Sequence, residues 1–258
     1  EYDLDLPEFN ISGEYVITVS FVLKEDTLWA DKGHEVAFSQ CVFNVKAKNI
    51  VDERIYVDLS VVESIHNIGV KGDDFEVMFS ALNGGLVSYK YAGKEMFDTI
   101  PRPNFWRAPT DNDMGNLMPQ RYAQWKIASK YLTHKYEKDG IIQMIFPVIE
   151  KFENSVVIKY EYLLPTNPSS RCFLSYEVFK DAKIKTTLEF EGNSELSAMP
   201  EFGVLFKLNA DYDNLQWYGL GESETYSDRK RGAKLSVYRN RVSDNMAKYL
   251  VPQECGNK

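Results

Sequence analysis

The sequence predicts an all-β sandwich with one short helix, and three features of the chain support this fold class. Stretches in which apolar and polar residues alternate recur along most of the 258 residues, and this period of two is typical of half-buried strands. Turn-forming residues separate these stretches at the spacing of a β-sandwich. One segment alone, residues 119–132, carries a helical pattern. Because the chain is 44% hydrophobic and 14% aromatic, it can bury a sizeable core, as one large β domain or two smaller ones.

Two strands are predicted in the first part of the chain. Apolar residues alternate with smaller or polar ones over Tyr15–Leu23, and Glu35–Val45 gives a second strand. Between them, Lys24–Gly33 turns the chain, with Trp29 as its anchor. Two strands with one buried face need partner strands to be stable. We therefore expect this segment to be the end of a sandwich that begins outside the sequence.

A domain boundary is expected in the next stretch. Ala47–Asp52 is polar and suits a linker, and Arg54–Val62 alternates as a further strand. The pattern breaks at Gly69–Asp74, where glycine and aspartate favour a turn. These features divide the chain into a first domain at residues 1–62 and a second at residues 63–258.

From Phe75 onward the sequence predicts an antiparallel meander. Phe75–Phe79 alternates, and Asn83–Gly85 is a strong hairpin signal. Leu86–Tyr91 returns as the next strand, before Ala92 and Gly93 turn the chain again. Further strands are predicted after residue 140, at Ile141–Val148, Val156–Leu164, Arg171–Phe179, Lys183–Phe190 and Val204–Leu208.

The single predicted helix runs from Pro119 to Leu132. Proline suits a first helical position, because its missing N–H has no partner there in any case. Tyr122, Trp125, Ser129 and Leu132 fall on one helical face, which is the pattern of a helix that packs against a core.

The stretch Arg102–Asn116 contains the densest group of turn-forming residues. Its two prolines fix their own backbone and push the preceding residues toward extended conformations. Gly115 suits a left-handed position, and the Asp-Asn-Asp run can form Asx-turns. Arg107 lies close in sequence to Asp111 and Asp113. We therefore expect a long ordered loop, anchored by its aromatic residues and held by Arg–Asp hydrogen bonds.

Three blocks of the sequence resemble the large family 2 β-galactosidases. The run Arg107–Gly115, which reads R-A-P-T-D-N-D-M-G, resembles the hallmark of their C-terminal β-supersandwich domain. Trp217–Arg229 is similar to the family's W-x-G-x-G-P-x-E-N-Y-x-D-R, with Ser223 and Thr225 in place of its Pro and Asn. Thr27–Ala37 resembles the closing strands of the immunoglobulin-like domain that comes before it. The blocks follow the family's order and cover nearly the whole chain.

The resemblance implies both a fold and an activity. Residues 1–62 would be the C-terminal part of an immunoglobulin-like β-sandwich, and residues 63–258 a C-terminally truncated, galactose mutarotase-like β-supersandwich. Strand edges left open at the two ends would favour self-association. The intact enzyme would hydrolyse terminal β-galactosides such as lactose with retention. Because the family's catalytic glutamates lie in a TIM-barrel domain upstream, this chain would hold no catalytic residue and would contribute structure, assembly contacts and part of the substrate-pocket wall.

The resemblance also points to one candidate rim of the substrate pocket. The segment Gly93–Pro103 corresponds to a mobile loop at the mouth of the barrel, and Gly93, Lys94 and Glu95 are its candidate residues. An ordinary surface connection is the alternative. A role toward ligand also stays open for Glu222 and Glu224.

Asp111 and Asp113 could be read as a catalytic pair instead. A retaining glycosidase needs two carboxyl groups about 5–5.5 Å apart that face each other across a sugar. Two carboxylates two positions apart beside an arginine are more simply explained as acceptors that hold a loop. The predicted loop-fixing residues are Arg107, Asp111, Asn112, Asp113, Glu224, Asp228 and Arg229.

The glycines of Gly219-Leu220-Gly221 could open a dinucleotide-binding motif, but the third glycine and the surrounding βαβ unit are missing. We expect a tight backbone corner there. A short basic run, Lys230, Arg231 and Lys234, is expected to be a solvated loop.

Charge and composition exclude several classes of partner. The chain has 30 basic and 38 acidic residues, for a formal net charge of −8, and nucleic acid or anionic lipid requires a basic surface. No apolar run reaches the ~20 residues that span a bilayer, and the first residues do not form a signal peptide. We therefore expect no nucleic-acid or membrane partner. The expected partners are the N-terminal domains of the same polypeptide, a β-galactoside substrate in the intact enzyme, and further copies in a homo-oligomer.

No cofactor or metal site is predicted in this chain. Its three cysteines form no C-x-x-C pair, and its three histidines have no metal-ligand spacing. Free thiols suit a reducing compartment, so the cytoplasm is expected. The resemblance implies that the intact enzyme uses Mg²⁺ and a monovalent cation at sites in other domains.

Two other functions stay open at this point. The chain could be a free-standing sugar-binding or mutarotase-like module, which would need an acid–base pair such as His with Glu. Only His134 follows the break at Gly69–Asp74 that marks entry into the second domain. It could also be a purely structural interaction domain.

Overall fold

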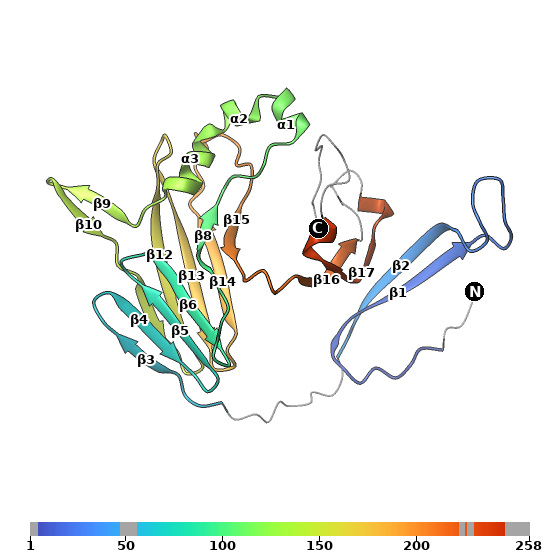
Figure 1. Ribbon diagram of the computed structural model, residues 1–258, viewed down its shortest axis with the longest axis horizontal. Helices are drawn as coiled ribbons and strands as arrows, with labels where there is room; N and C mark the ends of the chain where they lie inside the picture. Colours follow the sequence, from blue (N-terminus) through green and yellow to red (C-terminus); the bar gives the residue numbers. More distant parts are fainter. Residues whose placement is uncertain (1–4, 47–55, 222–224, 226–229, 246–258) are drawn as a thin grey trace. The chain divides into compact units, whose positions relative to one another are not determined.

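A computed structural model describes residues 5–46, 56–221, 225 and 230–245, and it shows an all-β protein with three short helices (Figure 1). The described residues fall into two compact units, the first made of residues 5–46, 213–221, 225 and 230–245 and the second of residues 56–212. The all-β prediction is confirmed. No helix in these residues is long and apolar enough to cross a membrane.

The first unit consists of two antiparallel hairpins. β1 (Gly13–Val22) pairs with β2 (Glu35–Val45), which confirms the two predicted N-terminal strands. β16 (Asn214–Gly221) pairs with β17 (Lys234–Arg241), and the 3₁₀ turns Lys230–Gly232 and Val242–Asn245 flank β17.

Side chains of β2 join these two hairpins. The Gln40 amide donates to the Leu235 carbonyl oxygen at 3.0 Å and accepts from the Leu235 N–H at 2.8 Å. Glu35 forms an ion pair with Lys234 at 2.7 Å. Lys234 therefore begins a strand and holds a partner, so the prediction that it belongs to a solvated loop is wrong.

The predicted corner at Gly219–Gly221 is also wrong, because both glycines lie within β16. A Cβ at Gly221 would come within 2.8 Å of the Tyr238 ring on the paired strand, and that ring stacks on Trp217. The glycine is thus explained by close approach of an aromatic ring and not by a turn.

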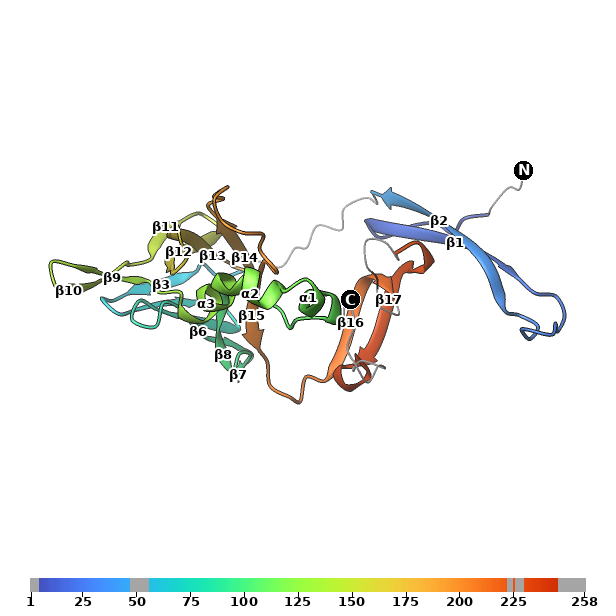
Figure 2. The same cartoon turned by 90° about the horizontal axis from the view of Figure 1, so that it is seen from above.

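Two sheets form the core of the second unit, and Figure 2 shows them as two layers. One sheet has the order β3-β4-β5-β6-β7 and the other β11-β12-β13-β14, both antiparallel. The strands of the first are β3 (Ser60–Glu63), β4 (Asn67–Lys71), β5 (Phe75–Ser80), β6 (Gly85–Tyr91) and β7 (Lys94–Glu95). Those of the second are β11 (Val148–Lys151), β12 (Ser155–Leu164), β13 (Ser170–Phe179) and β14 (Ile184–Phe190).

Alternation along the strands builds the core between these sheets. In β12 the side chains of Ile158, Tyr160 and Tyr162 are buried, while the residues between them face outward. Outward-facing Lys159 forms an ion pair with Glu189 at 2.8 Å on the exposed face. Burial of each large apolar side chain contributes about 1.5–3 kcal/mol, so this alternation fixes which face each strand turns inward.

Two strand boundaries differ from the prediction. The strand expected at Arg54–Val62 begins only at Ser60, and residues 54 and 55 lie outside the described part of the chain. Gly69 belongs to β4, and the turn follows at residues 72–74. Ile68 and Val70, on either side of Gly69, are buried. Their burial stabilises the strand, although the glycine between them suggests a turn in the sequence.

The segment after residue 104 contains three helices where the sequence predicts one. The helices are α1 (Asp111–Gly115), α2 (Met118–Arg121) and α3 (Ala123–Tyr131). The predicted helix is interrupted at Tyr122, whose φ of −116° lies outside the helical range. Its predicted inner face is correct, because Trp125 is buried and Tyr122 and Leu132 pack against the core.

Some strands were not predicted, and the strand expected at Ile141–Val148 already ends at Met144. β8 (Thr99–Asn104) carries two prolines and pairs with β15 (Gly203–Lys207). β9 (Lys135–Lys138) forms a hairpin with β10 (Ile141–Met144). Proline normally disfavours a strand, which explains why the pattern of β8 reads as loop.

Candidate functional site

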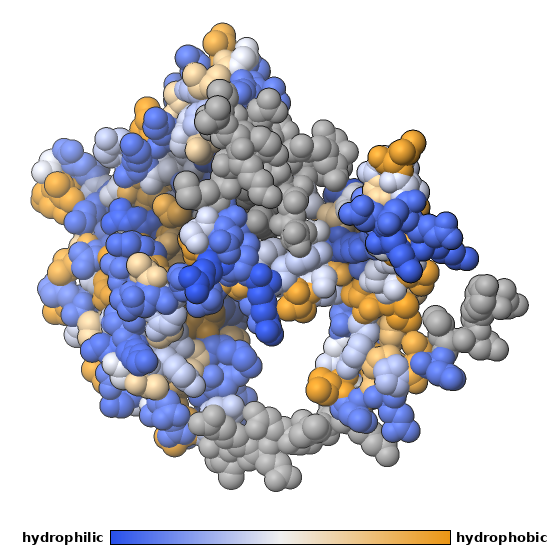
Figure 3. All heavy atoms as spheres, turned by 45° about the vertical axis from the view of Figure 1, so that its right-hand side comes forward, coloured by the Kyte–Doolittle hydropathy of each residue, from blue (hydrophilic) through white to orange (hydrophobic). Residues whose placement is uncertain are grey.

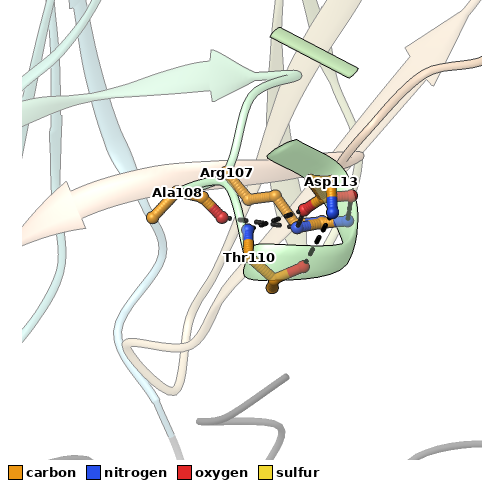
Figure 4. A network of polar contacts seen from close by, with 4 residues as sticks. All are labelled: Arg107, Ala108, Thr110 and Asp113. Carbon is orange, nitrogen blue, oxygen red and sulfur yellow. Dashed lines mark hydrogen bonds and ion pairs between the residues drawn. The ribbon is translucent and has the colours of Figure 1, made fainter. Parts of the chain in front are cut away.

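The start of α1 is fixed by a reciprocal pair of hydrogen bonds between Thr110 and Asp113 (Figure 4). Thr110 precedes the helix with φ −88° and ψ 174°, and its Oγ1 accepts from the Asp113 N–H at 3.3 Å. The Asp113 carboxylate accepts from the Thr110 N–H at 2.9 Å. This arrangement is a capping box, which satisfies two backbone donors that the helix cannot bond itself.

Arg107 binds the same carboxylate from the other side. Its Nη2 donates to Asp113 Oδ1 at 2.9 Å, its Nη1 donates to Asp113 Oδ2, and Nη1 also donates to the Ala108 carbonyl oxygen at 3.3 Å. Such bidentate pairs are among the strongest protein hydrogen bonds. Asp113 is only 7% exposed. The Arg107 hydrogen bonds, with smaller contributions from Thr110, outweigh burial and hold the pKa of Asp113 below its usual value, so the carboxylate is an anion.

The other acidic residue of this segment has a different environment. Asp111 is exposed at the first turn of α1, and residues two apart on a helix do not face each other. Asp113 is already occupied by Arg107 and Thr110, and a general acid would need a raised pKa. The arrangement thus favours a role in fixing the loop over a catalytic pair.

Two more residues of the segment have defined places. The carbonyl oxygen of Asn112, within α1, accepts from the Asn116 N–H at 3.0 Å. The expected left-handed conformation at Gly115 is wrong: Leu117, between α1 and α2, adopts it with φ 62°. Three of the predicted loop-fixing residues lie outside the described part of the chain: Glu224, Asp228 and Arg229. The same holds for Glu222, for which the sequence leaves a role toward ligand open.

Aromatic packing anchors the start of the segment that leads to α1. Phe105 is fully buried and contacts the rings of Trp125 and Phe190. Its N–H donates to Ser129 Oγ at 2.8 Å, and Trp125 Nε1 donates to the Ser197 carbonyl oxygen at 3.2 Å. The segment that carries Arg107 is thereby fixed to α3.

The rim candidate Gly93 lies in the two-residue turn between β6 and β7. Ala92 and Gly93 have φ of 47° and 77°, and the flanking Tyr91 and Lys94 are paired. Positive φ at both central residues is typical of a type I′ turn, which matches the twist of a hairpin. Lys94 is exposed at the start of β7.

Glu95 is held by its own hairpin. Its carboxylate accepts from the Tyr89 N–H at 2.8 Å, from the Met96 N–H at 3.2 Å, and from Ser88 Oγ. Burial alone would raise the pKa of Glu95, but these hydrogen bonds outweigh it and lower the pKa. The carboxylate is therefore directed into its own hairpin.

Beside this hairpin the second unit has an apolar groove of about 620 Å³. Tyr89 lines it and donates from its hydroxyl to the carbonyl oxygen of Ala182, another lining residue, at 2.8 Å. Asp181 and Lys183 form an ion pair at its edge. The other aromatic residues that line it are Tyr91, Phe97, Tyr176 and Phe206. The sequence does not reveal this groove, because apolar and polar residues alternate in the same way along a strand that faces a groove and along one that faces a core.

His134 does not provide the acid–base pair that a mutarotase-like module would need. Its Nε2 lies 3.1 Å from the Leu82 carbonyl oxygen, and Gly84 approaches so closely that a Cβ there would come within 2.4 Å of Nδ1. Burial, as the largest cause, lowers the pKa of His134. Among the described residues, no group of three or more His, Cys, Asp or Glu side chains could hold a metal ion.

Comparison with protein-family models finds two matches. A model described as "Beta galactosidase small chain" matches residues 71–258, and one described as "Beta-galactosidase, domain 4" matches residues 1–44. The predicted boundary between residues 62 and 63 lies in the interval between the matches and stays a prediction.

Curated proteins with similar sequences carry related names. A β-galactosidase of Halalkalibacterium halodurans is 41% identical over 96% of this chain and 24% of its own length. A β-galactosidase of Priestia megaterium is 36% identical over 96% of this chain and 23% of its own length. A "Beta-galactosidase small subunit" of Latilactobacillus sakei is 31% identical over 77% of this chain and 65% of its own length. The chain thus spans about a quarter of the first two relatives.

Proposed function

Because the chain belongs to the β-galactosidase small chain family, we propose that it is a non-catalytic C-terminal part of an enzyme that hydrolyses terminal β-galactosides such as lactose. The family match over residues 71–258 is the observation that carries this proposal. The chemistry would be retaining, with one glutamate attacking the anomeric carbon and another protonating the leaving oxygen. Both glutamates would lie in other domains of the polypeptide.

The side-chain arrangement supports a structural role for this part of the enzyme. The carboxylates of Asp113 and Glu95 both accept hydrogen bonds from neighbouring residues of their own segments. His134 is buried against a backbone carbonyl oxygen. Groups fixed in this way can shape and stiffen a surface. We propose that the chain contributes structural support, assembly contacts and part of the substrate-pocket wall. The cation sites would lie in other domains, and the enzyme would be cytoplasmic.

Activity measurements on the isolated chain test this assignment. It should hydrolyse a nitrophenyl β-galactoside no faster than buffer, because it would lack both glutamates. Turnover that persists in a second independent preparation would contradict the assignment.

Within that wall, we assign the rim position to the turn at Ala92 and Gly93. The turn is exposed, and behind it the Glu95 carboxylate on β7 accepts from the Tyr89 N–H on β6. Gly93→Ala in the intact enzyme should then shift KM or kcat for lactose, because a residue with a Cβ is strained at φ 77°.

The hairpin β9–β10 offers a matched control. Gly140 has φ 76° and also follows a residue with positive φ, Asp139, and neither Gly93 nor Gly140 has an atom within 4 Å of an added Cβ. Gly140→Ala should lower the free energy of unfolding by the same amount, about 1 kcal/mol, without changing the kinetics. If KM and kcat of Gly93→Ala do not differ from those of Gly140→Ala, the Gly93 turn is an ordinary surface connection.

A further inference from the structure

We propose that His134 holds the turn between β5 and β6 while its ring is neutral, and loosens that turn when the ring is protonated in mildly acidic solution. The turn consists of residues 81–84, between Ser80 at the end of β5 and Gly85 at the start of β6. His134 lies between α3 and β9. This pH-sensitive contact goes beyond the proposed function and does not depend on it.

Burial distinguishes His134 from the charged groups at the surface. On the face drawn in Figure 3, hydrophilic residues lie among hydrophobic ones in contact with water. Exposed charges are screened and contribute little to stability. His134 is only 9% exposed, so a charge on its ring affects the fold far more than a charge at the surface does.

The hydrogen bond to the turn determines which nitrogen of the neutral ring carries the proton. Nε2 of His134 lies 3.1 Å from the Leu82 carbonyl oxygen, and a carbonyl oxygen can only accept. Nε2 is therefore the donor, and Nδ1 carries no proton in the neutral ring. Protonation of the ring must take place at Nδ1.

Nδ1 of His134 faces a part of the turn that leaves it little room. Gly84 has φ 64°, and a Cβ there would come within 2.4 Å of Nδ1 and 2.7 Å of Cε1. Gly84 is itself buried. A proton at Nδ1 thus places a positive charge where water can hardly solvate it, which burial makes costly.

Burial is the largest influence on the pKa of His134 and lowers it below its ordinary value of 6.5. The carbonyl oxygens of Leu82 and Ala81 favour the protonated ring and act in the opposite direction. The cations of Lys135, the next residue, and Arg102, on β8, lower the pKa further. The folded chain therefore keeps the ring neutral at neutral pH.

The turn and the tyrosine that binds it do not change charge in this pH range. Residues 81–84 contain no titratable side chain. Tyr162, on β12, donates from its hydroxyl to the Gly84 carbonyl oxygen at 2.6 Å, and burial raises the pKa of this tyrosine. It stays neutral in acid and keeps its hydrogen bond. Protonation of His134 therefore loosens the turn and leaves the two sheets joined.

The backbone around His134 is held from the other side. Thr133 exchanges backbone hydrogen bonds with Leu163, on β12, at 3.0 and 2.7 Å. The Ile145 N–H donates to the His134 carbonyl oxygen at 2.7 Å. The turn is the more easily displaced partner, because Leu82 is exposed to solvent. Its movement relieves the unfavourable contact with a charged ring.

The sign of the pH dependence follows from the lowered pKa of His134. The unfolded chain binds the proton near the ordinary value of 6.5, and the folded chain binds it only at lower pH. The contact is therefore complete above about pH 7 and is lost progressively as pH falls from 6.5 toward the folded-state pKa. Below the folded-state pKa no further loss occurs.

Amide hydrogen exchange, measured by NMR on the 258-residue chain, tests the contact. Two amides report on the turn: the Ala81 N–H donates to the His66 carbonyl oxygen at 2.8 Å, and the Asn83 N–H donates to Ser80 Oγ at 3.2 Å. After correction for the intrinsic exchange rate, their protection should fall at least about threefold between about pH 7 and about pH 5. Protection that does not change over this range would overturn the proposal.

Two variants separate His134 from other effects of pH. His134→Gln keeps a donor for the Leu82 carbonyl oxygen and does not titrate, so the protection of Ala81 and Asn83 should no longer depend on pH. His66→Gln removes an exposed histidine of the same unit and should behave as the wild type. Equal pH dependence in the His134→Gln and wild-type chains would contradict the assignment to His134.

Titration of His134 in the wild-type chain gives a test that requires no variant. The ring C–H signals of the three histidines can be followed by NMR as the pH is lowered. His134 should titrate below its ordinary pKa of 6.5 while the chain stays folded. Titration of His134 at or above 6.5 would overturn the proposal, because protonation would then not oppose the contact.

Discussion

At the residue scale, the ion pair between Arg107 and Asp113 is the main side-chain contact that holds the segment around α1. The sequence predicted an Arg–Asp cluster from proximity along the chain, and the structure brings Arg107 to Asp113 and leaves Asp111 exposed. The choice between the two carboxylates could not be predicted, because it depends on the helix that begins at Asp111 and turns Asp113 back toward Thr110. The sequence predicted a loop here, and a loop does not specify which side chains share a face.

Arg107→Ala should destabilise the chain by about 1–3 kcal/mol, because it leaves a buried carboxylate without its charge-assisted partner. Asp111→Asn is the matched control, since it changes an exposed carboxylate of the same helix and should cost less than about 0.5 kcal/mol. Urea unfolding at neutral pH measures both. Equal effects would show that the ion pair does not hold the segment.

The same contact predicts a dependence on pH. The pKa of Asp113 is lower in the folded chain than its ordinary value of 3.8, so its ion pair stabilises the fold above that value and loses its effect as pH falls through the folded-state pKa. The difference in unfolding free energy between the wild type and Arg107→Ala should thus be constant from about pH 7 to about pH 5 and shrink below about pH 4. A difference that stays constant down to about pH 2.5 would contradict this account.

At the element scale, alternation predicted the long strands well and the short ones poorly. β2 has the predicted bounds, and β12, β13 and β14 lie within a residue of theirs. Burial of one face makes such strands visible in the sequence. β8 escaped prediction because of its prolines, and it is a strand because β15 pairs with it. Pairing between segments about 100 residues apart leaves no local signal.

Hydrogen bonds from tyrosines link the two sheets of the second unit. Tyr162, on β12, is 2% exposed, and its hydroxyl donates to the Gly84 carbonyl oxygen at 2.6 Å in the turn between β5 and β6. Tyr162→Phe should destabilise the chain by about 1–3 kcal/mol, because the buried carbonyl oxygen loses its partner.

Tyr136→Phe provides the comparison. Its hydroxyl donates to Gln143 Oε1 at 2.7 Å on the exposed hairpin β9–β10, where water can replace it, so the loss should stay below about 0.5 kcal/mol. Thermal or urea unfolding of the two variants separates the effects. Similar losses would mean that the bond to Gly84 does not join the sheets.

At the scale of the whole molecule, motifs predicted the family and periodicity predicted the fold class. The blocks at Arg107–Gly115 and Trp217–Arg229 fall within the residues that the small-chain model matches. The groove beside Tyr89 was not predicted, because it depends on how distant strands meet. The rim role of Gly93, Lys94 and Glu95 stays a prediction.

We propose that this chain supports a catalytic centre that would lie in other domains of the same polypeptide. The most direct measurement compares nitrophenyl β-galactoside hydrolysis by three samples: the chain alone, the intact enzyme with this segment deleted, and a mixture of the two. We expect no turnover by the chain alone, impaired turnover by the deleted enzyme, and recovery that saturates as the chain is added. Turnover by the chain alone, or full activity of the deleted enzyme without it, would contradict the claim.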